Sequence, residues 1–302
     1  MILKRKAFRS LIAILMVIVC ITSCLFTATA DTAAEKGSVD IVVNTSKGKN
    51  SYSAYLSKHS KSEYSSEDAV SKLNGTIVDK KAIDFNINVE KDGLYAIGMS
   101  YKALDEDMAE ICIGLKIDGK FVYTNMKDLE FPRFWGDSDG INADYVGNEY
   151  VPEQILYDGY VYAEAFDEAL EATEKFMVDL TKGEHTITII PVKGKFAIEY
   201  FKFAATAQSS EYTAPENDSQ YYKGDAIIIE GEDASLKSSY FLVGNSERSS
   251  IDVTPQSVEN RLINYIGNNW SHIGDTIVWE TPELKEGYYK LGFSFSQETV
   301  IG

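Results

Sequence analysis

An internal repeat is the sequence feature that most restricts how this 302-residue chain can fold. Residues 91–101 (KDGLYAIGMSY) match residues 285–295 (KEGYYKLGFSF), with Lys, Gly, Tyr, Gly and Ser at the same positions. Self-similarity at an offset of 194 residues indicates two copies of one domain rather than the short units of a solenoid. The sequence stops at Gly302, soon after the second copy, so we expect an incomplete second domain and the N-terminal piece of a longer protein, or a truncated reading frame.

The pattern around the repeat is that of β-strands. Apolar and polar residues alternate at 83–90 and 111–117, and the dipeptide Asp118-Gly119 is typical of a two-residue hairpin turn. Many short alternating strands predict an all-β protein built from jelly-roll β-sandwiches. Helical patterns occur at 52–61 and 67–73.

Composition divides the chain into five segments. A stretch rich in Ser, Glu, Asn and Gln separates the two copies of the repeat and is typical of a linker. The predicted segments are a signal peptide (1–30), a tether (31–50), a first jelly-roll module (51–205), a linker (206–224) and a second, truncated jelly-roll module (225–302).

The first thirty residues predict export. Four basic residues precede an apolar run at 11–21, which is the order of a secretory signal and is short for a stable membrane span. Two processing sites compete: Cys24 ends a sequence that resembles a bacterial lipobox, and Ala-Thr-Ala at 28–30 resembles an ordinary cleavage site. We favour lipidation of Cys24, which predicts an extracellular protein that is held to the plasma membrane at the cell surface only by its lipid anchor.

Net charge limits the partners of the mature chain. The formal charge is −17, and removal of the signal leaves 25 basic and 46 acidic residues. Because phosphates need Lys and Arg for neutralisation, this balance excludes duplex nucleic acid as a partner. The mature chain keeps one interior cysteine, Cys112, so an internal disulfide is excluded and the core must supply the stability.

Three motifs follow one another in the first module. They are Gly-x-Tyr-x-Ile at 93–97, a strand that ends in Asp118-Gly119, and a closing strand FAIEYFKF at 196–203. Together they resemble galactose-binding-like carbohydrate-binding modules of families 6 and 35. Further short stretches resemble the N-terminal modules of large secreted Gram-positive proteins encoded beside carbohydrate ABC transporters; they lie at 52–59, 131–135, 147–154, 182–186 and 264–270. The resemblance implies binding of oligosaccharides or polysaccharides, in support of sugar capture by such a transporter.

Aromatic residues with polar neighbours are the candidates for sugar contact. Rings stack on the C–H faces of pyranoses, and Asn, Asp, Gln or Arg side chains bond the hydroxyls. Two stretches, 133–157 and 264–270, have this mixture, although aromatic side chains with a polar tip also pack loops onto a core. The predicted carbohydrate-binding residues are Arg133, Trp135, Asp144, Tyr145, Asn148, Tyr150, Gln154, Asn268 and Trp270.

Glu230 and Glu232 are candidate metal ligands. Alternate residues of a strand share a face, so their carboxylates would lie together, either solvated or around a hard cation. In the modules that the chain resembles, two acids at this place in the first strand often bind a structural calcium, and the resemblance implies the same here. The first module lacks a clear Glu-x-Glu strand, which leaves calcium there open.

Catalytic motifs are missing from the sequence. It contains no nucleophile elbow, phosphate loop or His-based metal motif, and among 46 acids some pair is always available by chance. We therefore expect a binding protein rather than an enzyme. Two alternatives stay open: spacer or adhesion modules that bind a protein partner, and an appendage of a solute-binding or catalytic domain further downstream.

Overall fold

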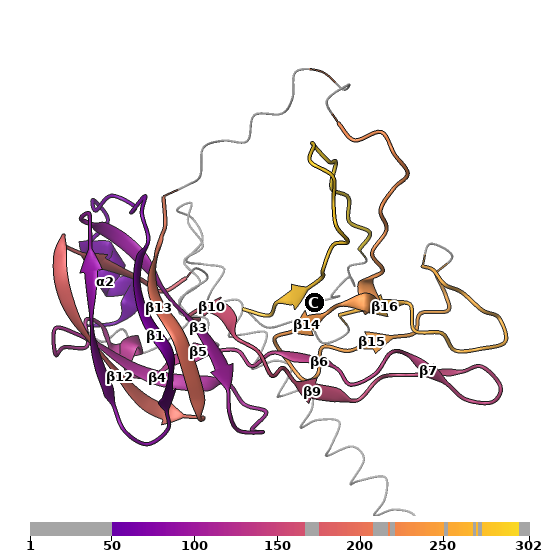
Figure 1. Ribbon diagram of the computed structural model, residues 1–302, viewed down its shortest axis with the longest axis horizontal. Coiled ribbons are helices and arrows are strands. Elements are labelled where there is room, and N and C mark those ends of the chain that lie inside the picture. The colour runs from indigo at the N-terminus through magenta and orange to yellow at the C-terminus, as the bar shows by residue number, and fades with distance from the viewer. Residues whose placement is uncertain are drawn as a thin grey trace, which may run out of the picture. The chain divides into compact units, whose positions relative to one another are not determined.

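The computed structural model describes residues 50–166, 175–207, 217, 221–250, 253–267, 270 and 274–295. Its most regular part is an antiparallel β-sandwich of the jelly-roll type, as predicted from the alternating strands (Figure 1). One sheet contains, in order, β1 (Ala69–Val78), β13 (Phe196–Ala205), β3 (Gly93–Ala103) and β10 (Val161–Glu164), with β11 (Met177–Leu180) also paired to β3. The other contains β2 (Ile83–Val89), β12 (Gly183–Lys193), β4 (Ile111–Ile117) and β5 (Leu129–Phe131).

The first copy of the repeat forms the centre of the sandwich. It becomes β3, which is buried along most of its length because β13 pairs with one edge and β10 and β11 pair with the other. Apolar residues of both sheets form one core cluster, which includes Ile97 of β3, Leu115 of β4 and Ile189 of β12. Burial of this apolar surface is the main stabilising term of the module.

A short helix, α2 (Tyr52–Lys58), confirms the first helical pattern but ends three residues early. The Ser51 side chain caps it by accepting a hydrogen bond from the Ala54 amide at 3.3 Å. The Tyr52 hydroxyl donates to the Lys175 carbonyl (2.8 Å) and accepts from the Met177 amide (3.0 Å). These bonds hold the helix against the edge strand β11.

The second helical pattern, 67–73, is wrong. These residues begin β1, where Ala69 pairs with Phe203 and Lys72 with Tyr200. Strand pairing with β13 and burial of one face outweigh a weak local helix preference. A register shift between Lys72 and Thr76 then carries the strand past Gly75, which has a φ of +80°.

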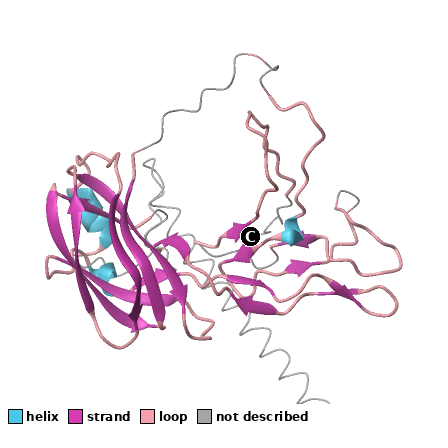
Figure 2. Cartoon of the chain, in the orientation of Figure 1, coloured by secondary structure: helices cyan, strands magenta, loops and turns pink. Residues whose placement is uncertain are grey.

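Short strands connect the two predicted modules. β6 (Trp135–Asp137) and β9 (Gln154–Leu156) form one sheet with β14 (Leu236–Lys237) and β17 (Ile277–Val278), in the order β17-β14-β6-β9. Two further pairs join β7 (Asn142–Ala143) to β8 (Glu149–Tyr150) and β15 (Gly244–Asn245) to β16 (Tyr265–Ile266), and two 3-10 turns lie at η1 (Thr124–Lys127) and η3 (Gly231–Asp233). Figure 2 shows that most of the chain after β13 is drawn as loop.

The second copy of the repeat does not form a regular strand. Residues 285–295 contain no strand, and their described ladder contact is one parallel bridge between Tyr221 and Tyr288. Leu291, Phe293 and Phe295 expose 83%, 73% and 84% of their surface. In the first copy β13 and β11 cover the same pattern, and the described residues provide no such neighbours here.

The leader segments cannot be compared with the structure. The predicted signal peptide, nearly all of the tether, and Cys24 lie outside the described residues. In the described part of the chain, none of the helices has the length and apolar character needed to span a membrane.

Candidate functional site

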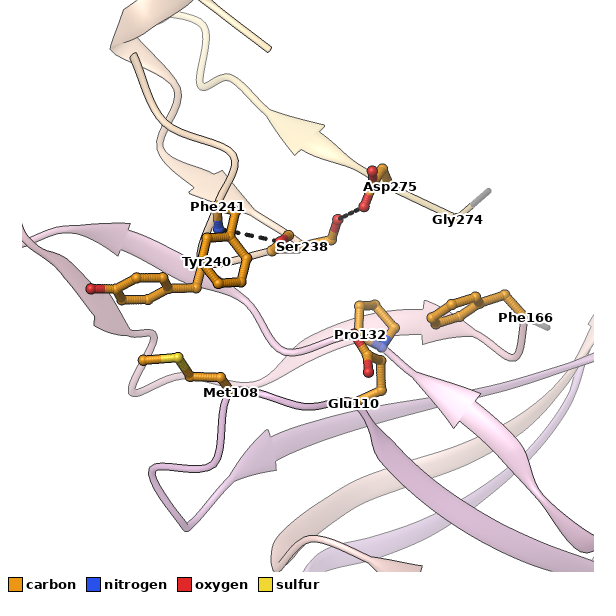
Figure 3. Close-up of a pocket in the computed structure, with 10 residues that line it drawn as sticks. Met108, Glu110, Pro132, Phe166, Ser238, Tyr240, Phe241, Gly274 and Asp275 are labelled. Carbon is orange, nitrogen blue, oxygen red and sulfur yellow. Dashed lines mark hydrogen bonds between the residues drawn. The ribbon is translucent and has the colours of Figure 1, made fainter. Parts of the chain in front are cut away.

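A pocket of about 220 Å³ lies between ends of the sandwich strands and two later segments (Figure 3). The sandwich contributes Met108, Glu110, Pro132 and Phe166, and the later segments contribute Ser238, Ser239, Tyr240, Phe241, Gly274 and Asp275. Strand pairing explains the juxtaposition, because Lys237 of β14 pairs antiparallel with Trp135 of β6. The residues after β14 therefore run beside the residues that precede β6.

Two aromatic rings, Tyr240 and Phe241, line one side of the pocket, and Trp135 packs against Tyr240 without lining the pocket itself. Trp135 meets Tyr240 edge to face, with centroids 5.1 Å apart, and Tyr240 meets Phe241 in the same way at 5.5 Å. Trp135 is buried, Tyr240 is half-buried and Phe241 is exposed, so the order runs from the core to solvent. Edge-to-face pairs contribute about 0.5–1.5 kcal/mol beyond area burial, which fixes the orientation of the Tyr240 ring.

Polar groups face the same pocket. Ser238 Oγ accepts from the Thr276 amide at 2.8 Å and lies 3.4 Å from Asp275 Oδ1, to which it donates. Ser239 Oγ accepts from the Phe241 amide at 3.3 Å. Glu110 is half-buried and takes part in none of the ion pairs formed within the described ranges. The pocket therefore combines aromatic faces with carboxylates and hydroxyls.

Gly274 and Phe166 close the opposite end. Gly274 has a φ of +91°, and a Cβ atom there would lie 2.9 Å from Phe166 Cδ2. Both the backbone conformation and the close approach of the ring require glycine at this position. In Figure 3 Phe166 lies at one end of the pocket and Met108 and Tyr240 at the other, with Glu110 and Pro132 between them.

Arg133 was predicted to contact sugar, but its side chain is only 1% exposed. Its Nε donates to the Ala109 carbonyl at 2.6 Å and its Nη1 to the Asp105 carbonyl at 3.0 Å, while Nη2 lies 2.5 Å from Asp105 Oδ1. This corrects the predicted sugar contact, because the guanidinium binds the β3–β4 loop instead of facing solvent. It holds the loop that carries Met108 and Glu110 to the pocket.

Trp135 and Gln154 are also buried and are corrected in the same way. The buried Trp135 ring packs against Tyr240 and does not offer its own face to a ligand. Gln154 Nε2 donates to Asp137 Oδ1 at 2.7 Å and to the Pro152 carbonyl at 3.0 Å. The Lys237 ammonium, itself buried, pairs with the same Asp137 carboxylate. These side chains join β6, β9 and β14 and have no free face for a ligand.

The other residues of the first predicted stretch lie on the β7–β8 hairpin. Asp144 accepts hydrogen bonds from the amides of Asn148 (2.8 Å) and Val146 (3.0 Å) and from the Asn148 side chain, which together lower the pKa of its carboxyl group. Asp144 and Asn148 thus fix the turn, and at its tip Tyr145 is 100% exposed. Tyr150 is half exposed, but neither tyrosine lines the pocket.

Trp270 lies beside the pocket. Its ring is exposed, and Nε1 donates to the carbonyl of the pocket residue Asp275 at 3.2 Å. Its predicted companion Asn268 lies outside the described residues.

Glu230 and Glu232 do not share a strand face, which corrects the predicted geometry. Glu230 precedes η3 and Glu232 lies within it. Glu232 is 8% exposed, and its buried Oε2 has no hydrogen-bond partner among the described residues. Burial, and then the charges of Glu230, Asp233 and Glu149, raise the pKa of the Glu232 carboxyl. Within the part of the chain that the structure describes, no three His, Cys, Asp or Glu residues are grouped to hold a metal ion.

Sequence reasoning missed Tyr240, Phe241, Glu110 and Asp275. The tripeptide Ser239-Tyr240-Phe241 has the mixture of aromatic and hydroxyl side chains that marks the other candidates, so a composition signal was present. The two acids gave no such signal, because only the pairing of β6 with β14 brings their segments together.

Comparisons with known proteins give weak similarities. No family model matches the chain, and no curated protein matches it. Similar solved structures include a family 35 carbohydrate binding module from Clostridium thermocellum (13% identity, TM-score 0.26, 48% of this chain and 97% of that one). They also include a GH26-CBM35 β-(1,4)-mannanase from Podospora anserina (11% identity, TM-score 0.26, 50% of this chain and 30% of that one). A β-glucosidase from Paenibacillus barengoltzii matches with 12% identity and a TM-score of 0.23, over 46% of this chain and 10% of that one. These scores are too low to assign the chain to a family.

Proposed function

We propose that this chain is a non-catalytic carbohydrate-binding protein whose ligand occupies the pocket at Tyr240. The observation that carries the proposal is the joint presence of aromatic rings, carboxylates and hydroxyls around one cavity. A pyranose has apolar C–H faces and a rim of hydroxyl donors. An aromatic ring suits the first and Asp, Glu or Ser oxygen atoms suit the second. The sequence motifs that resemble carbohydrate-binding modules support the same function independently.

The test is titration of the full chain with a panel of plant, bacterial and host glycans. Tyr240→Ala should weaken binding by about tenfold or more, as expected for a central aromatic contact. Tyr64→Ala is the matched control, since Tyr64 is exposed on the chain but lines no part of the pocket. Equal losses in both variants, or binding by neither the variants nor the parent, would refute the proposal.

We also propose the location that the leader predicts: secretion, lipidation at Cys24 and display on the outer face of a Gram-positive plasma membrane. The support is the basic segment, the apolar run and the lipobox-like end. A surface-held sugar binder would raise the local concentration of oligosaccharide for an ABC transporter. Mass spectrometry of the mature N-terminus tests this, and a free Asp31 amine would contradict the lipid anchor.

Calcium at Glu232 is a further part of the proposal. A buried carboxylate oxygen without a partner, close to other acids, suits a hard cation that prefers oxygen ligands. Glu230 and Glu232 are the ligands that the sequence predicts, and the remaining oxygen ligands would have to come from carbonyl groups or water. We expect added calcium to raise the melting temperature and Glu232→Gln to abolish that rise. An identical melting curve in chelator and in calcium would contradict it.

One observation favours the second candidate function, a spacer or adhesion module that binds a protein. Leu291, Phe293 and Phe295 present a row of alternate exposed apolar side chains. Serine at all three positions should reduce self-association in light scattering and leave glycan binding unchanged. If those substitutions instead removed glycan binding, the two functions would share one surface.

A further inference from the structure

The outward faces of the two sandwich sheets differ in kind. On the sheet β2-β12-β4-β5, polar side chains of neighbouring strands bond to one another. Thr186 Oγ1 donates to Asn86 Oδ1 at 3.3 Å, and Thr188 Oγ1 donates to Asp84 Oδ1 at 2.6 Å. Water alone suits such a surface. The sheet β1-β13-β3-β10 instead presents tyrosines and aliphatic side chains outward, which makes it the candidate for a binding surface.

Two tyrosines cover the middle of this second sheet. Ser100 of the central strand β3 pairs with Tyr162 of β10 on one side and with Tyr200 of β13 on the other. The two rings are 18° from parallel, and their centroids are 6.2 Å apart. A Cβ atom at Gly98 would lie 2.5 Å from the Tyr162 hydroxyl oxygen, so the end of that ring lies on the backbone of β3. The rings therefore lie along the sheet and bury its centre, where Ser100 is 3% exposed.

A third tyrosine widens this layer toward the edge strand β1. Tyr160, just before β10, is 43% exposed, and its hydroxyl oxygen would lie 2.9 Å from a Cβ atom at Gly75 of β1. Val70 and Ile77 of β1 pair with outward residues of β13 and expose 48% and 59% of their surface. Together these side chains form an apolar surface from β10 to β1, called here the tyrosine face: Val70, Ile77, Tyr160, Tyr162 and Tyr200.

The charges on the tyrosine face are matched. Lys102 and Lys202 each pair with an aspartate just outside the strands, at 2.5 Å and 3.2 Å. The acid of β10 pairs with a lysine at 2.7 Å, and the Lys202 ammonium also lies 4.2 Å from the centroid of the Tyr162 ring. The exposed Lys72 and Glu199 add one charge of each sign. A ligand of high charge therefore gains little here, and an uncharged ligand with apolar faces and many hydroxyl groups fits best.

We propose that the tyrosine face binds the flat side of an extended, uncharged polysaccharide chain, at a second site apart from the pocket at Tyr240; the inference rests on the proposed carbohydrate binding. The rings of a β-linked chain follow one another in a ribbon whose C–H faces can stack on several tyrosines at once. Lys72 and Glu199 can bond its hydroxyl groups. Because a sheet face has no walls, it takes consecutive sugars from the middle of a chain, and the affinity should grow with chain length.

The test compares trimers with hexamers of β-1,4-linked glucose, mannose and xylose, titrated into the full chain. At least one hexamer should bind more than about tenfold more tightly than its trimer, which exceeds the gain from the extra binding registers of a longer chain. Tyr160→Ala combined with Tyr200→Ala should remove most of this gain, since two of the three stacking rings are lost. Ile77→Asn, at the most exposed side chain of the face, disturbs no core contact and should lower the hexamer affinity about threefold.

Matched variants separate the tyrosine face from the pocket. Tyr145→Ala, at a fully exposed ring outside both sandwich sheets, should leave the ratio of hexamer to trimer affinity unchanged. Tyr240→Ala should leave binding at the tyrosine face in place, with its dependence on length.

Hexamers that bind no more tightly than trimers, or a dependence on length that survives in the double variant and in Ile77→Asn, would overturn this inference. The proposed function would then still stand, because Tyr240→Ala tests it separately. If none of these glycans bound the parent chain, the proposed function and this inference would both fail.

Discussion

Two hydrogen bonds at His185 make the first module sensitive to pH. Nδ1 lies 2.8 Å from Asp118 Oδ2 and Nε2 lies 2.8 Å from the Thr181 carbonyl, so both ring nitrogens face acceptors. Burial opposes the charged ring, but the bonds to Thr181 and Asp118 outweigh it and raise the pKa of His185. A raised folded pKa adds stability that is complete below the unfolded value of about 6.5 and is lost as the pH rises through the folded value.

The free energy of unfolding should therefore fall as the pH is raised from about 6 to 8. His185→Gln should flatten this part of the profile and cost about 1–3 kcal/mol at pH 6, where both hydrogen bonds are complete. Urea unfolding at each pH measures both effects. A profile with the same slope in the variant would show that another group titrates in this range.

Arg133 is a second residue whose role the structure changes. Its charge is buried and matched by Asp105, and its other donors serve carbonyl groups of the same loop. Arg133→Met should destabilise the chain by about 3 kcal/mol, the lower part of the range for breaking a buried pair, because Asp105 still reaches water. Chemical denaturation measures this. Arg248→Met, at an exposed arginine, is the control and should stay within about 0.5 kcal/mol.

At the scale of elements, the alternation of apolar and polar residues predicted strands correctly, although their partners lie far along the chain. The alternation at 83–90 and 111–117 became β2 and β4, and Asp118-Gly119 became the turn, with φ values of +51° and +76°. The pattern at 67–73 failed because pairing with β13 and burial of one face outweigh a weak local helix preference. The second copy of the repeat also differs from its prediction. Its sequence pattern is that of a strand, but no described strand flanks it.

The helix α2 owes its place to tertiary bonds, which makes it testable as an element. Seven residues are too few for a stable isolated helix, so its packing must hold it. Tyr52→Phe removes the bonds to Lys175 and Met177 and leaves the buried Met177 amide unpaired, at a cost of about 1–3 kcal/mol. Thermal unfolding measures this loss. Tyr64→Phe, at an exposed ring, should unfold like the parent.

At the scale of the whole chain, the pocket depends on contacts that no local pattern encodes. Its two halves are separated in sequence by more than seventy residues, between Phe166 and Ser238, and by the stretch predicted to be a linker. Two of the predicted aromatic residues lie near the pocket: Trp135 supports Tyr240, and Trp270 lies beside the pocket. Tyr240 has the same composition signal, but only the pairing of β6 with β14 places it beside the first module.

Lys237 is the buried side chain on which that pairing depends. It is 1% exposed, and its ammonium pairs with Asp137, which also accepts from Gln154. Lys237→Met should leave Asp137 without its cation and destabilise the sheet β17-β14-β6-β9 by about 3–5 kcal/mol. Since the sandwich has its own core, hydrogen exchange should quicken in this small sheet while β3, β12 and β13 keep their protection. Glycan binding should weaken as well, because the segment 238–241 loses its anchor.

Lys237→Met combined with Asp137→Leu should recover part of the stability, since no unpaired charge is left. Quickened exchange across both sheets of the sandwich in the single variant would instead show that the small sheet and the sandwich unfold as one cooperative unit.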